Sequence, residues 1–269
     1  MNDKIFVFQE IIKMRINIRK FDLDQIGSGV YLLVGLRGTG KYIFTCHLLE
    51  HKQYQTGIFF SSIVEHDPTL CHQYCPYLYV FEQYTPKILV GYIDRIHHKK
   101  SVDQPSVINF DHYRGEASIT SCPAMKQLLT DSKSLNSTTL LTMMIPERIP
   151  YHTHIDYVFI FMSSPNRRRL YVDYGQLFES YEQFEKILLV CTKRYGCLVI
   201  NNHPVSDQLC ENIYWYRVSE EEFYHLIGEE MVNMDLHVDY SRLCRRTTKS
   251  VELKVNDIPE GETEKDQGQ

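Results

Sequence analysis

The sequence lacks the features that mark a secreted, membrane-spanning or strongly basic protein. No stretch approaches the roughly 18 uninterrupted apolar residues of a membrane-spanning helix, and no apolar run follows the amino terminus as in a signal peptide. The 8 cysteines are scattered, without the dense spacing of a disulfide scaffold. Lys plus Arg is 29 and Asp plus Glu is 34, a net charge of −5, so the basic footprint of nucleic-acid contacts is missing. These absences favour a reduced, soluble protein and predict no membrane partner.

The residues that are present suit one large packed domain. The chain has 269 residues, 43% of them hydrophobic, which is enough for a core without a disulfide or metal staple. Apolar runs predict strands at 30–34, 56–60, 77–84, 107–111, 138–143, 157–161, 197–200 and 213–216, the last at a sheet edge. Helical spacing predicts helices at 86–96, 124–130, 167–174 and 181–195, and one that starts after residue 41. This alternation predicts an α/β fold, a mostly parallel central sheet with helices on both faces.

Composition divides the chain into four segments. Residues 1–26 form an N-terminal extension in which apolar and basic residues alternate. The main domain is predicted at 27–220, followed by a C-terminal helical segment at 221–247. Residues 248–269 are polar, acidic and glycine-containing, which predicts a disordered tail.

A glycine-rich phosphate-binding loop follows the first predicted core strand. The run Gly35-Leu36-Arg37-Gly38-Thr39-Gly40-Lys41 matches the P-loop pattern and lies between a strand and a helix, as that motif requires. Glycines let successive backbone N–H groups turn inward onto phosphate oxygens, and the helix N-terminus adds its positive end. This predicts that ATP binds to a P-loop NTPase domain at 27–220. The predicted nucleotide-binding residues are Gly35, Arg37, Gly38, Thr39, Gly40, Lys41 and Tyr42.

Tyr42 stands where Ser or Thr normally gives its hydroxyl to Mg²⁺. The phenol oxygen lies several ångströms too far from its own Cα to replace that short ligand, and the ring would crowd the metal. The sequence therefore keeps the half of the motif that binds the anion and loses the half that binds magnesium, which argues against Mg²⁺ as an ordinary cofactor here.

The carboxylate at the end of a second core strand also indicates a site whose magnesium chemistry is altered. Asp111 closes the predicted strand 107–111, the position of the residue that orients Mg²⁺ in P-loop enzymes. The alternative is an ordinary polar residue that ends a buried strand. Many such ATPases place a second acid next in sequence, but this chain has His112, which can accept a proton and cannot attract a metal-bound water as a carboxylate does. Asp111 is the predicted metal residue, and both residues are candidate catalytic groups.

The chain resembles the DNA-packaging ATPases of nucleocytoplasmic large DNA viruses, the poxvirus-type branch of the FtsK/HerA superfamily. The likeness covers most of residues 14–217. It rests on the blocks 35–41, 107–111, 140–144, 155–161, 166–171, 191–202 and 213–216. The later blocks have little to do with phosphate chemistry, so their likeness argues for shared descent rather than a convergent loop.

The resemblance implies a RecA-like fold and a ring-forming motor that threads viral DNA into a preformed capsid. It implies a glutamine-type sensor where this chain has Met144, and a trans-acting arginine finger near Lys133. Lysine keeps the charge of a finger and loses its bidentate fork. Together with Tyr42 and His112, four chemical positions depart from the family pattern, which predicts a paralogue with lost or weakened hydrolysis.

Three functional hypotheses follow. The first is a packaging-type ATPase of virion assembly that acts on viral double-stranded DNA, associates with capsid or packaging-motor subunits and forms homo- or hetero-oligomers, in the host cytoplasm or the virion. The second is a non-catalytic pseudo-ATPase that assembles with an active motor or the capsid. The third is an NTP-dependent regulator unrelated to packaging.

Three further clusters carry weaker alternatives. His66, Cys71, His72 and Cys75 could bind zinc, but their spacing is loose and buried thiols beside surface imidazoles are the simpler interpretation. The run 97–100 could touch DNA phosphates or be a solvated loop. The basic run 167–169 could face a neighbouring subunit, contact DNA or pair with acids of its own surface.

Overall fold

The fold is built on a nine-stranded sheet. The structure is a computed structural model, and it describes residues 18–61, 73–98, 105–111, 122–144, 152–162, 166–204 and 206–227. The strands are β1 (Arg19–Lys20), β2 (Gly29–Val34), β3 (Thr56–Phe60), β4 (Tyr77–Phe81), β5 (Ser106–Phe110), β6 (Ser137–Met143), β7 (Ile155–Ile160), β8 (Cys197–Asn201) and β9 (Ile213–Tyr216). They are ordered β1-β9-β8-β7-β2-β6-β5-β3-β4 across the sheet.

The sheet is mostly parallel, as the sequence predicted. Strand β2 pairs in parallel with β6 on one side and β7 on the other, and the series continues in parallel through β5, β3 and β4. Within the described sheet only β8 runs against its neighbours. Because parallel strands end on the same side, the residues that follow β2, β3, β5, β6 and β7 all lie along one edge of the sheet. This carboxyl edge holds the candidate site.

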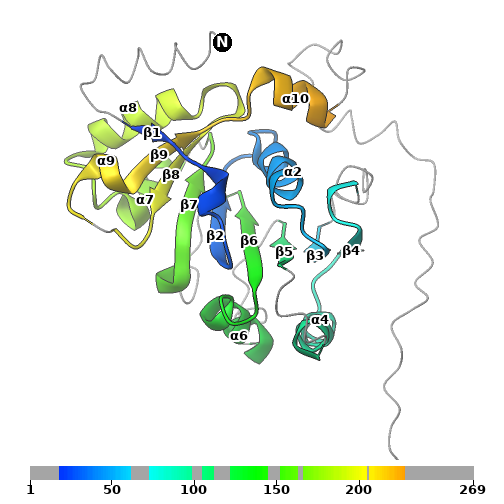
Figure 1. The fold of residues 1–269 in the computed structure, drawn as a ribbon. Coiled ribbons are helices and arrows are strands. Elements are labelled where there is room, and N and C mark those ends of the chain that lie inside the picture. Colours follow the sequence, from blue (N-terminus) through cyan, green and yellow to red (C-terminus); the bar gives the residue numbers. More distant parts are fainter. Residues whose placement is uncertain are drawn as a thin grey trace, which may run out of the picture.

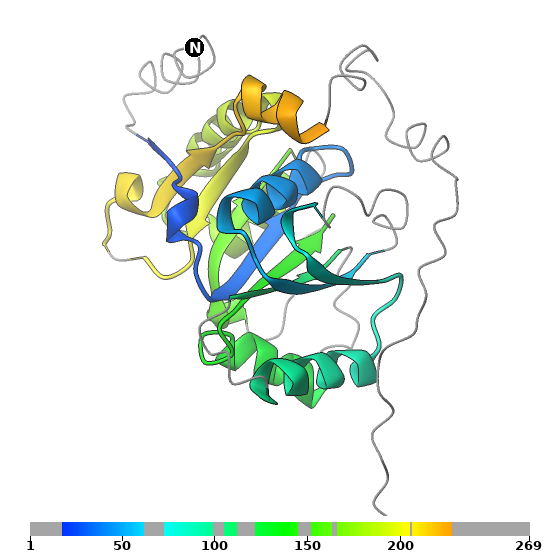
Figure 2. The same cartoon turned by 45° about the vertical axis from the view of Figure 1, so that its right-hand side comes forward.

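Helices cover both faces of the sheet (Figures 1 and 2). They are α2 (Lys41–Lys52), α4 (Pro86–His98), α6 (Pro123–Asp131), α7 (Arg167–Tyr174), α8 (Tyr181–Cys191), α9 (Leu209–Asn212) and α10 (Glu220–Ile227), with 3₁₀ turns η1 (Leu23–Gln25), η3 (His152–His154) and η4 (Lys193–Tyr195). Figure 1 shows α2 and α10 together on one side and α4 and α6 on the other. The predicted fold class is confirmed.

Strand β2 divides the core into two clusters because its side chains alternate between the faces. Val30, Leu32 and Val34 pack with residues of α4, α6, α7 and α8. Tyr31 and Leu33 pack with residues of α2, α10 and η1. All five side chains are buried, which explains why the sequence shows a continuous apolar run rather than an alternating one.

The end of the sheet formed by β1 and β9 differs from the prediction. The strand predicted at the edge, β9, is internal because β1 pairs with it, and Phe21 N donates to Trp215 O at 2.8 Å. Ile18 and Phe21, within the predicted extension 1–26, are buried, and α10 crosses the predicted boundary at residue 220. The domain boundaries themselves stay predictions.

The helix predicted at 181–195 ends earlier, at Cys191. Thr192 closes it, and Arg194 and Tyr195 then adopt left-handed backbone angles, with φ of 49° and 61°, inside the turn η4. A helix cannot continue through two such residues. The chain instead turns back into β8.

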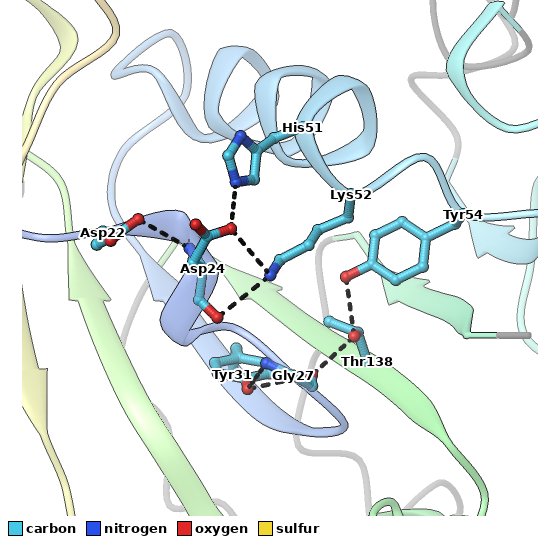
Figure 3. Close-up of polar contacts among 8 residues, drawn as sticks. All are labelled: Asp22, Asp24, Gly27, Tyr31, His51, Lys52, Tyr54 and Thr138. Carbon is cyan, nitrogen blue, oxygen red and sulfur yellow. Dashed lines mark hydrogen bonds and ion pairs between the residues drawn. The ribbon is translucent and has the colours of Figure 1, made fainter. Parts of the chain in front are cut away.

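A polar network at the amino ends of the strands fixes the two elements on either side of the phosphate loop (Figure 3). His51 and Lys52, at the end of α2, contact Asp24 of η1 at 2.9 and 3.9 Å. Tyr54 donates to Thr138 Oγ1 at 2.9 Å, and Thr138 donates to Gly27 O at 2.8 Å. These contacts join the end of α2, the start of β2 and β6, so both flanks of the loop are held to the sheet.

Candidate nucleotide-binding site

The site is assembled where five parallel strands end. Main-chain pairing places Val34 opposite both Met143 and Ile160, and Phe60 opposite Phe110. The residues that follow these positions are the phosphate loop, Ser61, Asp111, Met144 and the segment 161–162. Strand order therefore brings together residues that the sequence separates by up to about 120 positions.

The phosphate loop has the backbone that glycine permits. Gly38 and Gly40 have φ of 74° and 109°, in the left-handed region that other residues rarely adopt. A Cβ on Gly40 would lie 2.7 Å from the carbonyl oxygen of Tyr195, and a Cβ on Gly35 would lie 2.6 Å from Cβ of Phe161. These three glycines are required by conformation or by close packing, and the predicted loop residues are all at the predicted edge.

Lys41 begins α2 and is buried inside its own loop. Its Nζ donates to Gly35 O at 2.6 Å and to Leu36 O at 2.8 Å. Burial lowers the pKa of Lys41 to about 8, and the nearby charge of Asp111 partly opposes this shift. The ammonium thus lies within the loop, next to the backbone N–H groups of the helix N-terminus, where a phosphate would bind.

The two polar side chains of the loop differ in position. Thr39 Oγ1 donates to Leu36 O at 2.7 Å, so this hydroxyl shapes the loop from within. Arg37 is exposed at the tip of the loop, where its charge can approach a ligand from the solvent side. Both lie where the sequence predicted, and their contact with a nucleotide stays a prediction.

Tyr42 is half-buried and packs against the core cluster that includes residues of α2 and α10. Its ring therefore has a structural role beside the loop. A half-buried phenol is a poor substitute for the small Ser or Thr that the motif requires, which agrees with the sequence argument.

Asp111 lies at the carboxyl edge, one residue beyond β5. Its backbone N–H donates to Phe60 O at 2.9 Å, and its Oδ2 accepts from Ser61 Oγ at 2.7 Å. The electrostatic effect of Asp111 on Lys41 shows that the carboxylate and the ammonium are near each other. The donor set is oxygen only, which is the set that Mg²⁺ prefers. Asp111, held by the hydrogen bond from Ser61, thus fits a magnesium ion bound mainly through water.

Two other predicted positions give different outcomes. His112 lies outside the described residues. Met144 follows β6 on the same edge as the loop and is 37% exposed. Its thioether cannot donate a hydrogen bond, so it cannot orient water as a glutamine would.

Lys133 lies at the opposite edge of the sheet. Its Nζ is 3.2 Å from Asp156 Oδ1, and Asp156 Oδ2 accepts from Val30 N at 3.0 Å, near the start of β2. A six-residue strand rises by about 3.3 Å per residue, so roughly 17 Å of β2 separates Lys133 from the phosphate loop. Lys133 can therefore reach a bound phosphate only on another copy of the chain, and the finger role stays a prediction.

The arginines at the start of α7 have partners in their own chain. Arg167 Nη1 is 2.8 Å from Glu185 Oε1, and Arg169 Nε is 3.6 Å from Asp173 Oδ2. The guanidinium of Arg168 lies 5.3 Å from the centre of the Tyr181 ring. Arg167 and Arg169 thus pair with acids of their own surface, one of the three alternatives, and a contact with a neighbouring subunit or DNA stays a prediction.

The zinc candidates fall largely outside the described residues. Of the four residues, only Cys75 is described, and it is buried. Within the described part of the chain no group of three His, Cys, Asp or Glu side chains could hold a metal. Of the run 97–100, residues 97 and 98 end α4, residues 99 and 100 lie outside the described residues, and none of the four side chains is described.

Sequence reasoning missed two residues of the site. Ser61 follows directly on the predicted strand 56–60, and the parallel sheet would have placed it at the carboxyl edge. Tyr195, whose carbonyl contacts the position of Gly40, gave no local signal. It reaches the loop only because η4 folds back over the start of α2.

Comparisons with known proteins give viral relatives at low identity. No protein-family model matches the chain. An uncharacterized protein of Acanthamoeba polyphaga mimivirus is 21% identical over 226 residues, which are 78% of this chain and 80% of that protein. An uncharacterized protein of Invertebrate iridescent virus 3 is 24% identical over 228 residues, 77% of this chain and 86% of that one.

Solved structures with a similar arrangement include the genome packaging NTPase of Sulfolobus turreted icosahedral virus 2, solved with ATP-γS. The TM-score is 0.47 at 17% identity, over 71% of this chain and 97% of that one. EssC from Geobacillus thermodenitrificans gives a TM-score of 0.42 at 12% identity, over 74% and 44% of the two chains. At these TM-scores and identities the activity has to be argued from the site itself.

The described helices are all too short or too polar to cross a bilayer.

Proposed function

We propose that this chain is a viral DNA-packaging-type P-loop protein that binds ATP at residues 35–41 and acts in virion assembly with weakened hydrolysis. The observation that carries the proposal is the phosphate loop itself. A left-handed glycine turn joins a buried strand to a helix, and the ammonium of Lys41 lies inside the turn. This is the geometry that places several N–H donors and one positive charge around phosphate oxygens.

The packaging role draws on the sequence blocks and where they lie. The blocks 107–111, 140–144 and 155–161 belong to β5, β6 and β7, the strands around β2 that form the carboxyl edge. Similarity to proteins of three viruses supports a viral setting. Viral double-stranded DNA, capsid or packaging-motor subunits, and further copies of the chain are the proposed partners, in the host cytoplasm or the virion.

Weakened hydrolysis is supported by the absence of two side chains that the reaction requires. Tyr42 fills the position of the metal-binding hydroxyl, and Met144 fills that of the sensor. Bound magnesium would neutralise phosphate charge, with Asp111 as the residue that holds it. The phosphate loop and Lys41 can bind and orient the phosphates without these groups, so binding should survive better than turnover.

Binding is tested with a fluorescent ATP analogue. Lys41→Ala removes the ammonium from the loop and should weaken binding by about tenfold to a hundredfold, the effect of one charge-assisted hydrogen bond. Lys126→Ala is the matched control, because Lys126 is an exposed lysine on α6, away from the carboxyl edge. If the wild-type chain fails to bind, or if both variants bind equally well, the proposal is wrong.

A non-catalytic interaction protein is the second candidate, and Tyr42 is the observation that favours it. Phosphate release measured beside binding separates the two candidates. Magnesium-dependent turnover that Lys41→Ala abolishes would exclude the pseudo-ATPase. Metal-independent binding with no turnover would exclude the motor.

A further inference from the structure

Ser61 lies immediately after β3, beside the strand that ends at Asp111. Its hydroxyl donates to Asp111 Oδ2 at 2.7 Å, and its backbone N–H donates to Phe81 O at 2.9 Å. Ser61 is 1% exposed, whereas Asp111 is partly exposed, so their contact lies at the boundary between the core and the solvent-accessible edge. The backbone N–H of Asp111 donates to Phe60 O at 2.9 Å. The sheet itself therefore fixes the position of this serine–aspartate pair.

In a phosphate loop of the usual kind, a small hydroxyl residue after the lysine lies beside the strand carboxylate and magnesium. Here that position is occupied by Tyr42, which packs into the core. We propose that Ser61, after the neighbouring strand, partly offsets the loss of that hydroxyl as a positioning residue that holds Asp111 for magnesium. The inference rests on the proposed nucleotide binding and extends it, because it predicts that magnesium–ATP is the bound species despite Tyr42.

The chemistry follows from the two oxygens of the carboxylate. Oδ2 accepts the charge-assisted hydrogen bond from Ser61, which fixes the plane of the carboxylate. Oδ1 can then face magnesium or a magnesium-bound water. Hydrogen-bond partners that orient a metal-binding group typically change metal affinity by about 10-fold to 100-fold when they are removed. Ser61 is too buried to meet the ion itself, so it acts through Asp111.

The test measures how magnesium changes the affinity for the fluorescent ATP analogue, starting from excess EDTA. In the wild-type chain, magnesium should strengthen binding. Ser61→Ala should raise the magnesium concentration for the half-maximal effect by about tenfold or more, while the affinity in EDTA stays within about twofold of wild type. Ser106→Ala is the matched control, because Ser106 is also 1% exposed but begins β5 at the opposite edge.

A rescue variant separates positioning from a general structural effect. Tyr42→Ser restores a hydroxyl in the loop, so in the Ser61→Ala background it should return the half-maximal magnesium concentration toward the wild-type value. Should Ser61→Ala fail to fold, Ser61→Cys keeps the shape of the side chain with a somewhat larger atom and replaces a strong donor with a weak one. It should shift the magnesium dependence in the same direction.

Two outcomes would overturn the inference: a wild-type affinity that magnesium leaves unchanged, or a folded Ser61→Ala or Ser61→Cys with wild-type magnesium dependence. Neither outcome contradicts nucleotide binding at the phosphate loop, provided that binding in EDTA still depends on Lys41. Loss of all nucleotide binding by the wild-type chain would instead refute the proposed function first.

Discussion

Lys41 illustrates at the scale of one residue how the site is prepared for an anion. Lys41 is 8% exposed, and its ammonium donates hydrogen bonds to two neutral carbonyl oxygens of the loop. Removing a charge from water without a full counter-charge favours the neutral form. A bound phosphate would reverse this balance, because it brings the negative charge that the loop itself does not contain.

Nucleotide affinity should consequently fall as the pH rises through the pKa of Lys41, which burial lowers to about 8. Below this value the lysine is charged in the folded and the unfolded chain. Above it the folded chain releases the proton, whereas the unfolded chain keeps it up to about 10.5. We expect the affinity for the ATP analogue to weaken roughly threefold to tenfold between about pH 7.5 and pH 9.

Deprotonation of Lys41 weakens nucleotide binding, but it stabilises the folded chain when no nucleotide is bound. Because the unfolded chain binds more protons between the two pKa values, the contribution of Lys41 to the free energy of unfolding rises with pH in that window. Lys41→Met should therefore be more stable than wild type near neutral pH, and urea unfolding should show the difference shrinking as the pH rises. If the affinity for the ATP analogue stays constant up to about pH 9, the pKa of Lys41 is not lowered.

At the scale of elements, α10 connects the C-terminal part of the described chain to the phosphate loop. Phe223 stacks on Tyr195 with ring centres 5.4 Å apart. The carbonyl oxygen of Tyr195 lies 2.7 Å from where a Cβ on Gly40 would be, so Tyr195 packs closely on the phosphate loop. Glu50 of α2 accepts from His225 at 3.0 Å. Helix α10 thus supports the turn that closes over the start of α2.

Ser219 and Glu222 form a reciprocal cap at the start of α10. Ser219 N donates to Glu222 Oε2 at 2.8 Å, and Glu222 N donates to Ser219 Oγ at 3.2 Å. Ser219→Ala should destabilise the helix by about 1 kcal/mol, and we expect faster hydrogen–deuterium exchange of the α10 amides.

The control is Ser180→Ala, because Ser180 caps α8 through Gln183 N at 3.2 Å. That variant should speed exchange in α8 and leave α10 unchanged. Equal protection of α10 in wild type and Ser219→Ala would show that packing on α2 alone holds this helix.

At the scale of the whole molecule, the candidate residues lie at two opposite edges of the sheet. The phosphate loop and Asp111 lie at the carboxyl edge, and Lys133 lies at the amino edge, where it pairs with Asp156. The Lys133 side chain is 75% exposed, so this ion pair should add little stability. A ring in which the amino edge of one copy faces the carboxyl edge of the next would bring Lys133 to a neighbour's nucleotide.

Mixed assemblies test this arrangement. Lys133→Ala should lower the residual ATP turnover and keep the thermal stability of the wild type. Mixing it with Lys41→Ala should recover part of the turnover, because some interfaces then pair an intact loop with an intact Lys133. Lys126→Ala, which removes another exposed cation, on α6 and away from the carboxyl edge, should leave turnover unchanged. Mixtures no more active than the separate variants would argue against a trans role.

The sequence by itself was enough to predict the α/β class, most strands and the phosphate loop. These features are local: continuous apolar runs mark buried parallel strands, and glycines mark the turn that only they can form. The strand at 56–60 and the helix at 167–174 agree with β3 and α7 to the residue. The edge position of 213–216 was wrong because the pairing of β1 depends on a segment nearly two hundred residues away.

Only the tertiary structure decided which side chains meet. Ser61 and Asp111 are 50 residues apart, and their hydrogen bond exists because β3 and β5 are neighbours in a parallel sheet. The parallel direction of β2 and β6 likewise places Lys133, before β6, and Lys41, after β2, at opposite edges of the sheet, which no local pattern encodes. Local sequence could show that Tyr42 removes a hydroxyl from the phosphate loop, whereas the fold shows that Ser61 brings another one to Asp111. Hydrophobic spacing determines what each segment becomes, and the order in which the strands pair determines which segments share a site.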